Sequence, residues 1–88
     1  MKEVKVLITD KDGLHARPAS SLCREVAKFS EHVDLVYKDK KVNMKSTLGI
    51  MSLAIPKDSE LTICVTGDNE NEVAEKIVGI FKDLKLSE

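Results

Sequence analysis

Polar and hydrophobic residues alternate in four short segments of the chain, and this pattern predicts four β-strands. The segments cover residues 4–8, 33–37, 42–44 and 61–66. A period of two residues places one set of side chains on a core and the other set toward solvent. The polar sequence KDKK at 38–41 separates the second segment from the third, so these two segments are expected to form a hairpin.

Two longer segments have the three- and four-residue spacing of an amphipathic helix. In the first, apolar residues recur over 19–29, and the helix is expected to end near FSEH, residues 29–32. In the second, apolar residues recur over 73–84, and Asn69 with Glu72 fits a capping box at the start. Each helix therefore presents one apolar stripe for burial.

A shorter apolar run, TLGIMSLAI at 47–55, lies between Ser46 and Pro56. Serine is a favoured N-cap because its hydroxyl oxygen can accept a hydrogen bond from an unpaired helix N–H. The residue before a proline disfavours the helical conformation, so Pro56 is expected to stop this helix.

The predicted elements follow in the order β-α-β-β-α-β-α over residues 1–88, without a linker or repeat. At this length the chain is expected to be a single domain. Strands with alternating polar and apolar residues and helices with one apolar stripe can bury their apolar sides against each other in two layers. The helices would cover one face of an antiparallel sheet and leave the other toward solvent. The expected fold class is therefore α/β (α+β), an open-faced two-layer sandwich.

Composition limits the function classes. Apolar residues make up 42% of the chain and charged residues 33%, which is ordinary for a globular domain. A net charge of −1, with one Tyr, two Phe and no Trp, offers little to attract or stack nucleic acid. The sequence MKEVKVLITDKDG predicts neither a signal peptide nor membrane insertion. The protein is expected in the cytoplasm, as a monomer.

The cysteines and histidines predict neither a disulfide nor a metal site. Cys23 and Cys64 lie far apart and form no CxxC pair, so both are expected to be buried free thiols. The chain has two histidines, and the sequence suggests no carboxylates clustered with them. His32 has no motif around it. No metal and no cofactor are therefore expected.

The sequence GLHARPAS at 13–20 places His15 and Arg17 beside the start of the first predicted helix. Pro18 suits the first turn of a helix, because its missing N–H loses no hydrogen bond there. The unpaired N–H groups and partial positive charge of a helix start bind phosphate, and an arginine guanidinium suits phosphate oxygens. From the residues alone, His15 is either a transient carrier of a phosphoryl group or an ordinary surface residue.

GLHARPAS, together with KVNMKSTLGIMSLAI at 41–55, closely resembles the histidine-containing phosphocarrier family, HPr, of the bacterial sugar phosphotransferase system. The likeness spans nearly the whole chain. It implies that His15 accepts a phosphoryl group on Nδ1 from Enzyme I, which is charged by phosphoenolpyruvate, and passes it to sugar-specific EIIA domains. Arg17 would contact the phosphoryl group. The resemblance also implies a sheet order of 1-4-2-3 and a carrier that is not itself an enzyme.

Ser46 has a second role implied by the resemblance. In Gram-positive members of the family, the matching serine is phosphorylated by HPr kinase/phosphorylase, and the product is a corepressor for the catabolite control protein CcpA. From the residues alone, Ser46 is only a helix cap. An alternative function is that of a regulatory paralogue acting mainly through phosphorylated Ser46, although such paralogues lack the histidine matched by His15.

The resemblance further implies that partner proteins dock on the faces of the first two helices. The matching residues are Ser20, Arg24, Ala27, Thr47, Leu48 and Met51. Thr47 stands where Gram-positive members usually have a larger aliphatic residue. The sequence leaves open whether Leu48 and Met51 belong to the docking surface or to the core.

Overall fold

An antiparallel sheet forms one layer of the computed structural model, which describes residues 1–87. Its strands are β1 (Lys2–Leu7), β2 (His32–Tyr37), β3 (Lys40–Asn43) and β4 (Glu60–Thr66). They lie in the order β1-β4-β2-β3, so β4 and β2 are the central strands. Within the described residues, the strands predicted from the alternating pattern are confirmed, and so is the sheet order implied by the resemblance.

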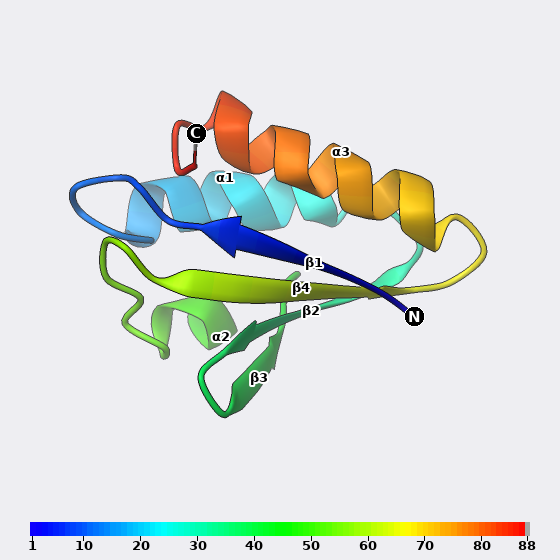
Figure 1. The fold of residues 1–88 in the computed structure, drawn as a ribbon, viewed down its shortest axis with the longest axis horizontal. Helices are drawn as coiled ribbons and strands as arrows, with labels where there is room; N and C mark the ends of the chain where they lie inside the picture. Colours follow the sequence, from blue (N-terminus) through cyan, green and yellow to red (C-terminus); the bar gives the residue numbers. More distant parts are fainter. Residues whose placement is uncertain (88) are drawn as a thin grey trace.

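Helices α1 (Ala16–Val26), α2 (Thr47–Met51) and α3 (Glu70–Asp83) form the second layer. Helices α1 and α3 run side by side along the sheet, and α2 lies against α1 and β3 (Figure 1). This arrangement confirms the open-faced sandwich. Among residues 1–87, no helix combines the length and the apolar character needed to cross a membrane.

The two layers meet in a core of apolar side chains. Val33 and Leu35 of β2 and Ile63 of β4 face this core, as do Ile77 and Phe81 of α3, and all five are at most 1% exposed. Strand side chains have a period of two residues, so a shift of one residue in pairing would turn the buried set toward solvent. The hydrophobic pattern therefore fixes the strand register as well as the strand positions.

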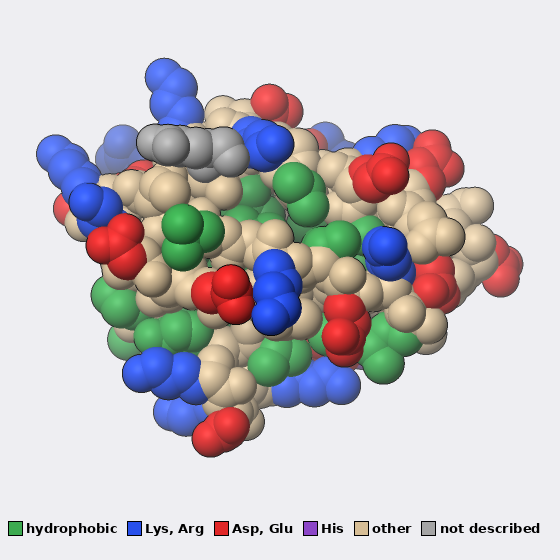
Figure 2. Space-filling view, viewed as in Figure 1, with side chains coloured by type: hydrophobic (Ala, Val, Ile, Leu, Met, Phe, Trp, Pro, Cys, Tyr) green, Lys and Arg blue, Asp and Glu red, His purple; other side chains and the backbone are tan. Residues whose placement is uncertain are grey.

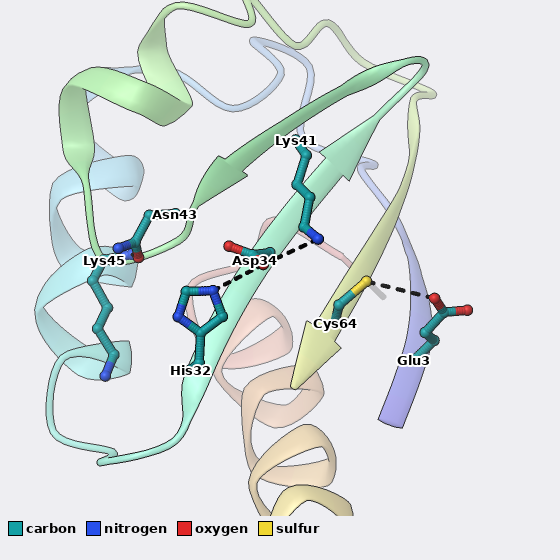
Figure 3. Close-up of polar contacts among 7 residues, drawn as sticks. All are labelled: Glu3, His32, Asp34, Lys41, Asn43, Lys45 and Cys64. Carbon is teal, nitrogen blue, oxygen red and sulfur yellow. Dashed lines mark hydrogen bonds and ion pairs between the residues drawn. The ribbon is translucent and has the colours of Figure 1, made fainter. Parts of the chain in front are cut away.

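The opposite face of the sheet carries polar side chains. One row of directly paired residues crosses the strands and is formed by Glu3, Cys64, Asp34 and Asn43 (Figure 3). Asp34 is only 8% exposed, and its Oδ2 lies 3.0 Å from His32 Nε2 and 3.5 Å from Lys41 Nζ. These partners offset the cost of removing the carboxylate from water.

Cys23 and Cys64 are both buried and free, as the sequence predicts. The Cys64 thiol donates to Glu3 Oε2, with 3.7 Å between the sulfur and the oxygen. Burial raises the pKa of this thiol, and the neighbouring Glu3 carboxylate raises it further. Cys64 is therefore held in its protonated form.

The outer surface shows no extended field of one sign on the face seen in Figure 2, for the residues that the structure describes. Acidic and basic side chains are interspersed there, with small apolar patches between them. This distribution agrees with the net charge of −1.

Helix α1 ends earlier than its apolar spacing predicts. Val26 is its last residue and Ala27 its C-cap, so the expected end at 29–32 is wrong by a few positions. Phe29 lies beyond the helix, where its N–H donates to the Val26 carbonyl oxygen at 3.1 Å, yet its side chain still packs against the core. The apolar stripe thus continues past the helix end.

Helix α2 ends at Met51, so the expectation that Pro56 stops it is wrong. Ser52 is the C-cap, and Ala54 has a left-handed backbone with φ of +50°. This turn redirects the chain before the proline is reached and leaves Ile55 buried in the core.

The capping box expected from Asn69 and Glu72 is also wrong. Asn69 is the N-cap of α3 by position, but its side chain makes no capping hydrogen bond with the described part of the chain. Its backbone N–H instead donates to Glu31 Oε2 at 3.3 Å. The carboxylate that accepts from the N-cap N–H therefore comes from the residue before β2, and not from Glu72.

Candidate functional site

His15 is the N-cap of α1, directly before the first helical residue. Its backbone is extended, with φ of −91° and ψ of 178°, and its carbonyl oxygen accepts from the Ala19 N–H at 3.0 Å. Its side chain is 41% exposed and makes no capping hydrogen bond within residues 1–87. The imidazole is therefore free to meet a partner molecule.

The loop before His15 is fixed by Gly13. The backbone of Gly13 is left-handed, with φ of +68°, and an added Cβ would lie 2.3 Å from the Ile55 carbonyl oxygen. Leu14 is buried, and its N–H donates to the same Ile55 oxygen at 2.9 Å. Only glycine permits this close approach without strain. The start of α1 is thereby held against the segment that follows α2.

A hollow of about 290 Å³ opens beside His15. It is lined by Asp10, His15, Arg17, Pro18, Ser21 and Leu84. Arg17 is exposed in the first turn of α1, where backbone N–H groups have no acceptor within the helix. Its guanidinium and these amides give the hollow a positive side that suits an anionic phosphoryl group.

Asp10 and Asp12 bring carboxylates to the other side of His15. Asp10 Oδ1 accepts from the Asp12 N–H at 2.8 Å, and Asp10 Oδ2 lies 3.8 Å from His15 Nε2. One ligand atom from each of the three residues lies within 4.8 Å of the others, so the group could hold a cation. The expectation that no carboxylates cluster with a histidine is therefore wrong, because the loop folds back on itself. The expectation that the protein binds no metal rested partly on the lack of such carboxylates, and it loses that argument.

Ser46 is the N-cap of α2, as predicted, and its Oγ accepts from the Gly49 N–H at 3.1 Å. The residue is half-buried. The ammonium of neighbouring Lys45 is engaged elsewhere, since its Nζ donates to the Phe29 carbonyl oxygen at 2.6 Å. The Ser46 hydroxyl therefore stabilises the short helix in the unmodified protein.

The docking residues expected on α1 and α2 differ in exposure. Leu48 is 84% exposed, which is unusual for a large apolar side chain, whereas Met51 is half-buried and packs against the core. Thr47 is half-buried, and Ser20, Arg24 and Ala27 are exposed. Arg24 lies beside α3, where it lines a groove with Ile80, Asp83 and other residues. Its side chain is thus available from the α3 side of α1.

Sequence inspection missed the two carboxylates beside His15 and a leucine that lines the same hollow. The spacing of Asp10 and Asp12 before Gly13 was a local signal, because a glycine turn can bring such carboxylates back toward the next side chains. Leu84 had no local signal, because it reaches the hollow from the end of α3.

Residues 2–83 match the family described as PTS HPr component, phosphorylation site. The phosphocarrier protein HPr of Mycoplasma capricolum subsp. capricolum is 39% identical over 86 residues, which cover 98% of this chain and 97% of that protein. The solved structure of the histidine-containing phosphocarrier protein of a mycoplasma superposes with a TM-score of 0.94 at 36% identity, over 99% of each chain.

A third relative is a regulatory protein. Crh of Bacillus subtilis, a catabolite repression protein solved as a dimer with a swapped domain, is 38% identical. Its TM-score is 0.73, over 96% of this chain and 97% of Crh. Sequence identity is therefore similar for the phosphocarrier and the regulatory relatives.

Proposed function

Because the chain belongs to the HPr phosphocarrier family of the phosphotransferase system, we propose that His15 accepts a phosphoryl group from Enzyme I and passes it to sugar-specific EIIA domains. The observation that carries the proposal is the free, part-exposed His15 imidazole at the start of α1, beside Arg17. The chain acts as a carrier, a substrate of other proteins with no turnover of its own.

The attacking atom in this proposal is His15 Nδ1, as the family resemblance implies, and the other ring nitrogen, Nε2, is the one that lies near Asp10. The transferred group would sit in the hollow beside α1. There the free amides of the first turn and the Arg17 guanidinium would offset the charge of its oxygens. These contacts should stabilise the phosphorylated form of His15 only moderately, because a carrier must also release the phosphoryl group to the next protein.

Incubation with Enzyme I and labelled phosphoenolpyruvate tests the proposal. We expect acid-labile label on the parent protein and none on His15→Ala. The matched control is His32→Ala, which removes the second histidine from the open face of the sheet and should label normally (Figure 3). Normal labelling of His15→Ala would overturn the carrier function.

We also infer that Ser46 is a substrate of HPr kinase/phosphorylase, and that the product binds CcpA. A phosphate on Ser46 would lie at the start of α2, where its charge meets unpaired N–H groups. Incubation with the kinase and labelled ATP should modify the parent but not Ser46→Ala. Retention of His15 argues against a purely regulatory paralogue, because the carrier residue would then have no use.

The proposed carrier is a cytoplasmic monomer. Docking of a partner requires an accessible His15 and the exposed Leu48, and both are accessible in the single chain. Light scattering after size exclusion should give the mass of one chain. A dimer mass would place this protein with the swapped-dimer relative instead.

A further inference from the structure

We propose that Asp10 is a positioning residue for the phosphoryl acceptor, because its carboxylate holds the proton of the His15 imidazole on Nε2 and leaves the lone pair of Nδ1 free to attack. The inference rests on the proposed role of His15 as acceptor. Asp10 lies outside the GLHARPAS motif, in the loop between β1 and α1.

The loop orients the Asp10 carboxylate. Its Oδ1 accepts from the Asp12 N–H at 2.8 Å, and the Asp10 carbonyl oxygen accepts from the Gly13 N–H at 2.9 Å. These two bonds fix the residue at the turn. Oδ2 remains directed at the ring, 3.8 Å from His15 Nε2. The Asp10 side chain is 22% exposed, so part of its surface is withdrawn from water.

A carboxylate beside one ring nitrogen selects the imidazole tautomer. Neutral imidazole carries one proton, and the negative charge of a carboxylate 3.8 Å from Nε2 favours the proton on that nitrogen. With the proton on Nε2, Nδ1 is the unprotonated nucleophile. Asp10 therefore determines which nitrogen of His15 can accept the phosphoryl group.

The same carboxylate stabilises the product of transfer. The Nδ1 lone pair forms the bond to phosphorus while the bond from phosphorus to the donor breaks, and that electron pair stays with the donor. The proton remains on Nε2, so the phosphorylated ring carries a positive charge. Asp10 Oδ2 faces that charge at short range, without touching the transferred group.

Asp10→Asn provides the test, because the amide oxygen can still accept from the Asp12 N–H while the negative charge is lost. At this distance, in a largely hydrated site, one charge pair changes a rate by about fivefold. We expect phosphoryl acceptance from Enzyme I to slow by about that factor. We also expect NMR of the imidazole nitrogens in the unphosphorylated variant to show a lower Nε2–H fraction. Asp10→Glu should recover part of both.

The matched control is Asp12→Asn, which removes the same charge from the same loop. Asp12 belongs to the three-residue group around His15, but only Asp10 comes within ion-pair distance of the ring among the described residues. Asp12→Asn should therefore change the transfer rate and the imidazole tautomer clearly less than Asp10→Asn does. An unchanged tautomer in Asp10→Asn, or equal slowing by both variants, would overturn the proposal. The NMR measurement needs no Enzyme I, so it judges Asp10 even if His15 proves not to be labelled.

Discussion

The backbone N–H of Leu14 donates to the carbonyl oxygen of Ile55 at 2.9 Å. This bond joins the residue before His15 to the segment that follows α2, the helix whose N-cap is Ser46. The two candidate phosphorylation sites thus belong to elements that are tied together by the backbone. A change in this contact should affect the whole candidate site.

Gly13→Ala should destabilise the protein by at least about 2 kcal/mol, because the new Cβ meets the Ile55 oxygen and the backbone is left-handed. Gly79→Ala is the matched control: this glycine lies in α3 with open space around it, so alanine should stabilise the helix by about 0.5–1 kcal/mol. Urea unfolding measures both. Equal stability of the two variants would show that the loop adapts.

Arg17→Ala should slow phosphoryl transfer in both directions by at least about tenfold. A charge-assisted contact contributes about 1.5–3 kcal/mol, and the exposed Arg17 side chain has little packing to lose. Rapid-quench labelling with Enzyme I measures the rate. Lys76→Ala, which removes an exposed positive charge from α3, should transfer normally. Parent-like kinetics for Arg17→Ala would contradict a role for its guanidinium.

Ser46→Asp should slow phosphorylation of His15 mainly through weaker binding of Enzyme I. The added charge lies on the helix that carries the exposed Leu48, and a partner surface that meets Arg17 and Arg24 is expected to be acidic. Added salt should restore part of the rate by screening. Titration calorimetry at low salt measures the binding, and parent-like affinity there would refute the electrostatic explanation.

The same serine gives a stability comparison. The carboxylate introduced by Ser46→Asp can accept from the Gly49 N–H in place of the serine Oγ, so this variant should unfold at nearly the parental temperature. Ser46→Ala loses the acceptor and should cost about 1 kcal/mol. Thermal unfolding distinguishes the two, and the reverse ranking would mean that the cap contributes little.

Cys64 should make stability fall at alkaline pH. Its folded pKa is raised above the ordinary value of 9.0, first by burial and then by Glu3. As pH rises, the thiol therefore loses its proton in the unfolded chain before it does so in the folded protein. The contribution of Cys64 to the free energy of unfolding is complete below the unfolded pKa and is lost as pH rises toward the folded pKa. The free energy of unfolding should decline more between about pH 8 and pH 10 in the parent than in Cys64→Ser. Parallel curves would exclude Cys64 as the cause.

Local patterns predicted the strands well because the two-residue period follows directly from which face is buried. Val33 and Leu35, for example, are buried and mark β2 from the sequence alone. Pairing across the sheet is not local, and the strand order came from the resemblance instead. The error at Asn69 has the same origin, because its N–H partner, Glu31, is distant in sequence.

In the candidate site, too, the features set by neighbouring residues were predictable and those set by tertiary structure were not. Neighbouring residues placed His15 beside the start of the first helix and identified Ser46 as an N-cap, because those residues form the helix starts themselves. The carboxylate of Asp10 was overlooked because its approach to His15 depends on the turn at Gly13. The orientation of Arg24 toward α3 depends on how two helices pack, which the spacing within one helix does not specify.

The polar row on the open face of the sheet also bears on solubility at high concentration. Stacking a second sheet on this face would strip water from the exposed side chains of His32 and Lys41 and would gain little apolar contact around them. Dry packing of one sheet face on another is one of the contacts that hold aggregated β-structure together. A phosphocarrier whose sheet has this uncovered polar face therefore gains little from stacking against a second copy, even at high concentration.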